Sequence, residues 1–185
     1  MNWVVMAFRR NYTLDQIHTL ICASEGRRSP VSGEPGHLVC LHADGRTRTT
    51  ADRRAKTVIV LAETLEKSRS MNPADGFITQ TGPSPGVDSR FTTRLDLVKA
   101  VFSALNGPTG QAKLSEFDSD ATKQRITFRA DVQPIIKNVE RYTKATSLLE
   151  RGLTASAVFL VIDRLGTSSN GEIHVQTAFP VDVST

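Results

Sequence analysis

The clearest alternation of apolar and polar residues lies near the C-terminal end of the chain. Two runs rich in β-branched and aromatic residues flank the polar linker 166–171, a pattern that predicts a hairpin with an open loop. The first run, 158–162, is apolar on both faces, as expected of a central strand. In the second run, one face is expected to hold Ile173, Val175, Thr177 and Phe179, and the other His174, Gln176 and Ala178. Pro180 is expected to end the ladder because it has no N–H to donate.

Apolar residues spaced by three or four positions predict helices earlier in the chain. Thr13 is expected to cap a short helix that runs to Ala23, and a longer helix is expected over 50–68. A third helix begins after Thr92 or Thr93, with Asp96 completing the cap, and the sequence 106–108 (Asn-Gly-Pro) is expected to stop it. The predicted buried stripes are Leu14, Ile17, Leu20 and Ile21 in the first helix, Val58, Leu61, Ala62 and Leu65 in the second, and Leu95, Val98, Val101, Phe102 and Leu105 in the third.

The segments between these elements are polar or rich in turn residues. Loops are expected over 24–36 and 109–124, and a flexible crossing over 71–90 with one short strand at 77–79. Alternation over 126–132 predicts a half-buried strand, whereas 139–149 fits either a helix or a strand with a bend.

Helices that precede strands in this order indicate an α+β fold with a mostly antiparallel sheet. Two divisions of the chain remain open. One has an N-terminal arm and short helix over 1–35 and a functional domain over 36–185, and the other is a single domain over 1–185.

Composition narrows the class of protein only slightly. The chain of 185 residues carries a net charge of +4 and has a pI of about 9.3, a balance that mildly favours an anionic partner such as nucleic acid. No run of 18 apolar residues occurs, so no membrane span is expected, and the N-terminal apolar stretch is too short for a signal peptide. Cys22 and Cys40 are too few for a disulfide framework; both are interpreted as free thiols, with one bridge as the alternative.

The residues that could carry chemistry are histidine, arginine and threonine. His37 and His42 lie five apart without a cysteine or acidic residue at metal-ligand spacing, and the signatures of nucleotide-binding loops and of serine hydrolases are absent. No metal or cofactor is therefore expected. Imidazole can take the proton of a ribose 2′-hydroxyl, and a guanidinium can hold the charge that develops on a phosphorane. This is the chemistry of RNA cleavage without a metal.

Four motifs, in this order, resemble one known family. They are GHLVCLH at 36–42, a following helix with early arginines, SRFTTRLDLVKAVFSALN at 89–106, and VFLVIDRL with GEIHVQTAFP at 158–180. Together they are similar to the RNase A-like toxin domains of bacterial contact-dependent inhibition systems. The resemblance implies a kidney-shaped α+β ribonuclease that needs no metal and cleaves RNA, with tRNA as one candidate substrate. It also implies export as part of a larger effector, action in the cytoplasm of a target cell, and a cognate immunity protein as partner.

The same resemblance assigns candidate site residues. The second histidine of the motif falls on His42, the general base or acid, and the basic residue of the following helix on Arg53, with Arg46, Arg48 and Arg54 as rivals or substrate-binding residues. Thr177 matches the threonine of the closing motif. His37 is a second catalytic candidate, although its position after Gly36 also suits a residue that orients the loop.

His174 is a further substrate-binding candidate, but it shares a face with Thr177 only if a bulge interrupts the strand. Phe179 stands where the family has tyrosine, so no role that needs a phenol is carried over to that position. This difference, and basic residues that are scattered rather than aligned, favour the alternative that the chain is a non-catalytic nucleic-acid-binding or assembly domain.

Overall fold

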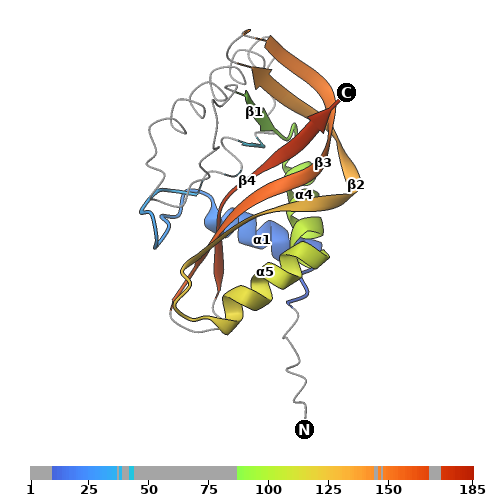
Figure 1. Cartoon of the computed structure of the whole chain (residues 1–185). Coiled ribbons are helices and arrows are strands. Elements are labelled where there is room, and N and C mark those ends of the chain that lie inside the picture. Colours follow the sequence, from blue (N-terminus) through green and yellow to red (C-terminus); the bar gives the residue numbers. More distant parts are fainter. Residues whose placement is uncertain are drawn as a thin grey trace.

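The computed structural model describes residues 10–36, 38, 42–43, 87–143, 146, 148–166 and 172–185. Within these residues the chain forms three helices, α1 (Leu14–Ser24), α4 (Arg94–Asn106) and α5 (Pro108–Ser119). It also forms four strands, β1 (Val87–Arg90), β2 (Arg125–Thr143), β3 (Leu148–Arg164) and β4 (Ile173–Ser184), in one sheet of order β1-β2-β3-β4. All neighbouring strands are antiparallel, so the α+β class with an antiparallel sheet is confirmed (Figure 1).

The sheet bends strongly along its two longest strands. The register between β2 and β3 shifts three times between Asp131 and Arg141, and β1 pairs only with the part of β2 beyond these shifts. The bend carries β1 toward the other edge of the sheet, where the Ser89 hydroxyl donates a hydrogen bond to the carbonyl of Pro180 in β4. Residues from both edge strands therefore meet (Figure 1).

The hydrophobic core lies between the helices and one face of the sheet, which we call the helix-covered face. On this face Phe128 of β2, Leu160 of β3 and Ala178 of β4 lie side by side, and all three are buried in the core. Ile17 and Ile21 of α1 belong to the same core as the inner side of α4. The opposite face of the sheet carries Phe159, Val161, Thr177 and Phe179.

Two helix starts agree with the sequence analysis. Thr13 caps α1 in a full capping box with Gln16, and Thr93 caps α4 by accepting from the Asp96 N–H. The apolar stripes are partly wrong, because Leu14 and Leu95 are about half exposed. Each of these residues is the first or second in its helix, where the chain has not yet turned toward the core.

The loop predicted over 109–124 is wrong, since most of it forms α5. Pro108 ends one helix and begins the next: its missing N–H is one of the four that a helix start leaves unbonded anyway, so proline suits this position. Only Leu114 and Phe117 among its large side chains are buried, which is why apolar periodicity did not reveal the helix.

The strand predictions were right in type but too short. Residues 139–143 are the end of β2 and residues 148–149 the start of β3, so the helix alternative is wrong, and the segment belongs to two strands rather than to one strand with a bend. The crossing predicted over 71–90 ends in β1. The helix expected over 50–68, the strand at 77–79 and residues 1–9 of the N-terminal arm lie outside the described residues.

Pro180 does not end the ladder, because β4 continues to Ser184 and Val181 still pairs with Ala157. β4 is an edge strand, and the N–H and C=O of one residue in a strand point the same way. The Pro180 carbonyl points away from β3, toward Ser89. The missing N–H would therefore also point outward, and the ladder loses nothing.

No helix in the described ranges is both long and apolar enough to cross a membrane.

Candidate functional site

A bulge in β4 determines which side chains share a face of the sheet. Val161 of β3 pairs with Thr177, but the next residue, Ile162, pairs with Val175, so Gln176 is one extra residue in β4. Beyond it, Asp163 pairs with His174. Asp163 and Val161 lie two apart in regular β3, so His174 lies on the same face as Thr177. The alternation predicted for this strand is wrong: Val175 and Ala178 face the core, while His174 joins Thr177 and Phe179 on the opposite face.

His42 reaches this face from a distant part of the chain. Its imidazole lies against the ring of Phe179, with centroids 5.4 Å apart, and Phe179 in turn contacts Phe159 at 5.2 Å. The His42 carbonyl accepts a hydrogen bond from the Phe91 N–H at 2.8 Å. Leu38, four residues earlier, is completely buried in the core, and both residues have helical backbone.

Thr177 lies two residues before Phe179 on the same face of β4, a separation of about 7 Å along a strand. The Thr177 side chain is buried, and within the described part of the chain its hydroxyl has no hydrogen-bond partner. A buried hydroxyl without a partner costs about 1–3 kcal/mol, so such groups are rare and call for an explanation. The histidine segment and the closing strand thus meet, with His42 and Thr177 both next to Phe179.

Neither side chain is open to solvent. His42 is 2% exposed and Thr177 is 3% exposed. Both predicted residues are therefore enclosed by the protein.

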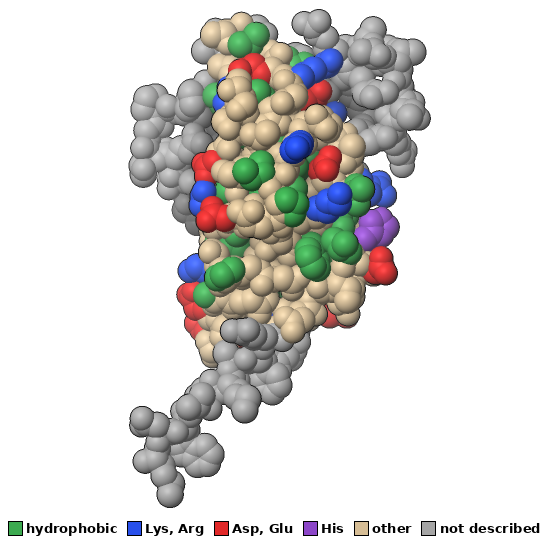
Figure 2. Space-filling model, turned by 90° about the vertical axis from the view of Figure 1, so that its right-hand side faces the viewer, with side chains coloured by type: hydrophobic (Ala, Val, Ile, Leu, Met, Phe, Trp, Pro, Cys, Tyr) green, Lys and Arg blue, Asp and Glu red, His purple; other side chains and the backbone are tan. Residues whose placement is uncertain are grey.

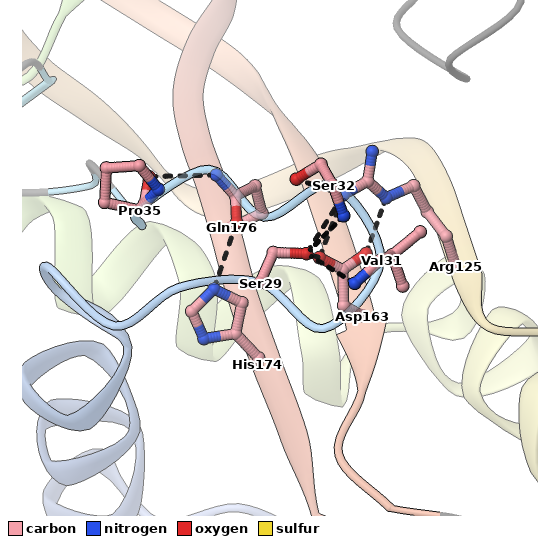
Figure 3. A network of polar contacts seen from close by, with 8 residues as sticks. All are labelled: Ser29, Val31, Ser32, Pro35, Arg125, Asp163, His174 and Gln176. Atoms are coloured by element: carbon pink, nitrogen blue, oxygen red, sulfur yellow. Dashed lines mark hydrogen bonds and ion pairs between the residues drawn. The ribbon is translucent and has the colours of Figure 1, made fainter.

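His174 belongs to a buried network that joins β4 to the loop after α1 (Figure 3). Its Nε2 lies 3.0 Å from Oε1 of Gln176, and Nε2 of Gln176 donates to the Pro35 carbonyl at 3.0 Å. Since the amide oxygen accepts, the imidazole carries its proton on Nε2, which leaves Nδ1 without a partner among the described side chains and backbone. Burial lowers the pKa of His174 below its usual 6.5, and the charges of Arg27 and Arg125 lower it further against the opposing effects of Gln176 and Asp163.

This lowered pKa predicts a loss of stability in weak acid. The unfolded chain takes up a proton on His174 below about pH 6.5, whereas the folded chain does not until the pH falls to the lower native pKa. Between these values the unfolded state binds more protons, so the free energy of unfolding should decrease as the pH falls from about 6.5 toward the lower native pKa. Urea unfolding of His174→Gln should show a flatter pH dependence in this window. An unchanged slope in His174→Gln would contradict the assignment.

Charged side chains of the described sheet are largely paired with each other. Arg125 contacts Asp163 at 2.5 Å, and Asp163 also accepts from Ser29 at 2.5 Å (Figure 3). Glu140 lies between the buried Arg90, at 3.3 Å, and Arg151, at 3.1 Å. On the face drawn in Figure 2, basic and acidic side chains are interspersed rather than gathered by sign. Lys and Arg are as numerous as Asp and Glu among the described residues, so the net charge of +4 is carried by the rest of the sequence, half of it by 44–86.

Several predicted site residues lie outside the described part of the chain: His37, Arg46, Arg48, Arg53 and Arg54. Sequence reasoning missed three residues that build the site. Phe91 holds the His42 backbone, Gln176 makes the bulge and bonds to Pro35, and Asp163 binds Ser29. Of these three, only Asp163 could have been suspected from the sequence, because a lone acidic residue directly after an apolar run indicates a buried charge that needs a partner.

Comparison of the chain with models of known families, with curated proteins and with solved structures finds no significant match. Within the residues that the structure describes, no group of three or more His, Cys, Asp or Glu side chains is arranged to hold a metal ion.

Proposed function

We propose that the protein is a ribonuclease toxin that cleaves RNA without a metal, with His42 and Thr177 in its active site. The observation that supports this most is the meeting of the histidine segment with the closing strand. His42 lies against Phe179, and the hydroxyl of Thr177, two residues away on the same face, has no partner among the described residues. An imidazole can take the proton of a ribose 2′-hydroxyl, and a threonine hydroxyl can donate a hydrogen bond to a phosphate oxygen.

In this reaction the ribose 2′-oxygen attacks the adjacent phosphorus. His42 takes the 2′-hydroxyl proton as the new O–P bond forms, and the P–O5′ bond breaks as the 5′-oxygen receives a proton from a second group, for which His37 is the candidate. The Thr177 hydroxyl donates a hydrogen bond to a non-bridging phosphate oxygen. Arg53, or one of Arg46, Arg48 and Arg54, supplies positive charge to the phosphorane. The products are a 2′,3′-cyclic phosphate and a free 5′-hydroxyl.

The biological setting that accompanies this proposal is that of a toxin. The domain would be exported on a larger effector, act on RNA such as tRNA in the cytoplasm of a target cell, and be held inactive in the producer by an immunity protein. An immunity protein with an acidic face would suit the net positive charge of the chain.

Cleavage of total RNA in excess EDTA tests the proposal. Purified folded protein is expected to degrade the RNA progressively, because no step uses a metal. RNA that stays intact at a high ratio of protein to RNA, with folding verified by circular dichroism, would contradict the proposed activity.

The burial of both key side chains favours one alternative, a non-catalytic nucleic-acid-binding or assembly domain. A catalytic base must come within hydrogen-bond reach of its substrate, and His42 is only 2% exposed. The two functions differ in one measurement: a binding domain retains RNA on a filter or in a gel shift but never shortens it.

A further inference from the structure

The loop between α1 and the histidine segment is fastened to the strand that carries Thr177. This 25–36 loop closes on itself through the bond from Gly26 N–H to the Gly36 carbonyl, at 2.9 Å, and the bond from Gly36 N–H to the Arg27 carbonyl, also at 2.9 Å. Its middle is attached to β3 through Ser29 and Asp163, and its end to β4 through Pro35 and Gln176 (Figure 3). Gly36, where the loop ends, is followed after two residues by the buried Leu38 and after six by His42.

Gly36 has no room for a side chain at this junction. A Cβ atom there would lie 2.2 Å from the Ser24 carbonyl oxygen and 3.2 Å from Cε1 of His174. The Ser24 hydroxyl in turn accepts from the Val175 N–H at 3.1 Å. The close approach fixes the end of the loop against β4 by contact, while Gln176 fixes it by a hydrogen bond.

The Gln176 amide can make this bond in only one orientation. Its two polar ends are used by different partners, the Pro35 carbonyl and Nε2 of His174. A flipped amide would set its oxygen against the Pro35 carbonyl, which can only accept. Both Gln176 and His174 are completely buried, so water cannot compensate for such a mismatch.

We propose that Gln176 is a positioning residue: as the extra residue of the β4 bulge, it sets the place of His42 relative to Thr177 by holding Pro35. With the amide held by Pro35, its oxygen accepts from Nε2 of His174 at 3.0 Å. The catalytic consequence rests on the proposed ribonuclease function, whereas the effect on the position of His42 does not. The bulge thus has two effects, because it also turns His174 to the face of Thr177.

The variant Gln176→Met tests this, with Gln111→Met as the matched control. Gln111 also donates to two backbone carbonyls, those of Arg10 and Leu105, each at 2.7 Å, but it sits at the junction of α4 and α5. The first readout is the NMR signals of the His42 ring, which depend on its stacking against Phe179. These signals are expected to move in Gln176→Met and to stay in place in Gln111→Met. Unmoved signals in folded Gln176→Met would overturn the positioning role, whatever the activity.

The second readout is kinetic. Gln176→Met is expected to lower kcat for RNA about 10- to 100-fold, since small displacements of catalytic groups have effects of this size, with little change in KM. Gln111→Met should keep the wild-type kcat even where its thermal stability falls as much. If Gln176→Met does not fold, Gln176→Asn, which shortens the side chain by one methylene, takes its place in both measurements. If the His42 signals move in Gln176→Met but the wild-type protein cleaves no RNA, the positioning role is supported and the ribonuclease proposal is contradicted.

Discussion

Replacing His42 by alanine is expected to lower the rate of RNA cleavage by about 10²- to 10⁴-fold, the usual contribution of a general base. Binding of RNA should stay close to wild type, because the imidazole acts on the reacting proton and not on the phosphate chain. The measurement is cleavage of a labelled oligoribonucleotide in EDTA under single-turnover conditions, together with a filter-binding titration on the same substrate.

His42 is also a packing residue, so the alanine variant needs two controls. Its ring fills space against Phe179, and a cavity there would lower stability. His42→Gln keeps most of the volume but cannot act as a base, and it should be as inactive as His42→Ala. His18→Ala changes an exposed histidine on α1 and should cleave at the wild-type rate. Retained cleavage in a folded His42→Gln would exclude His42 as the base.

The largest effect on stability is expected at Arg164, which is 1% exposed. Its guanidinium donates to the carbonyls of Phe117, Asp120 and Lys123 around the end of α5, and it lies 4.1 Å from the centroid of the Phe117 ring. The last carbonyls of a helix have no partner within the helix and carry its negative dipole end. Arg164 therefore bonds the end of α5 to the last residue of β3.

Arg164→Met keeps the length and apolar stem of the side chain but leaves three carbonyls without this donor. We expect a loss of about 3 kcal/mol or more in the free energy of unfolding, which corresponds to a decrease in Tm of roughly 10 °C for a chain of this size. Arg129→Met is the matched control: Arg129 pairs with Asp182 at the surface and should contribute at most about 1 kcal/mol. Thermal unfolding followed by circular dichroism decides between them, and equal losses in the two variants would refute the role of Arg164.

The parts of the fold that sequence predicted well depend on short-range signals. Thr13 and Thr93 indicate helix starts because each threonine side chain accepts from the backbone N–H of the residue three positions later, in the same turn. The strands β3 and β4 follow from runs of β-branched and aromatic residues, and the α+β class follows from the order of the elements. The placement of Thr177 in the closing strand came from the same signal.

What sequence could not predict depends on contacts between distant residues. A bulge adds one residue to one of two paired strands. Nothing in the sequence around Gln176 distinguishes this residue from its neighbours until its pairing with β3 is known. The bond between Ser29 and Asp163 joins residues 134 positions apart. The contacts of His42 with the Phe91 backbone and the Phe179 ring join residues that neither spacing nor composition connects.

The most direct test of the proposed chemistry uses a DNA oligonucleotide that contains a single ribonucleotide, incubated with the protein in EDTA. Attack by the 2′-hydroxyl through His42 and Thr177 predicts one cut, immediately 3′ of the ribonucleotide, with a 2′,3′-cyclic phosphate on one fragment and a 5′-hydroxyl on the other. Mass spectrometry identifies both ends. An oligonucleotide that stays intact while total RNA is degraded, or a cut at a deoxynucleotide, would contradict it.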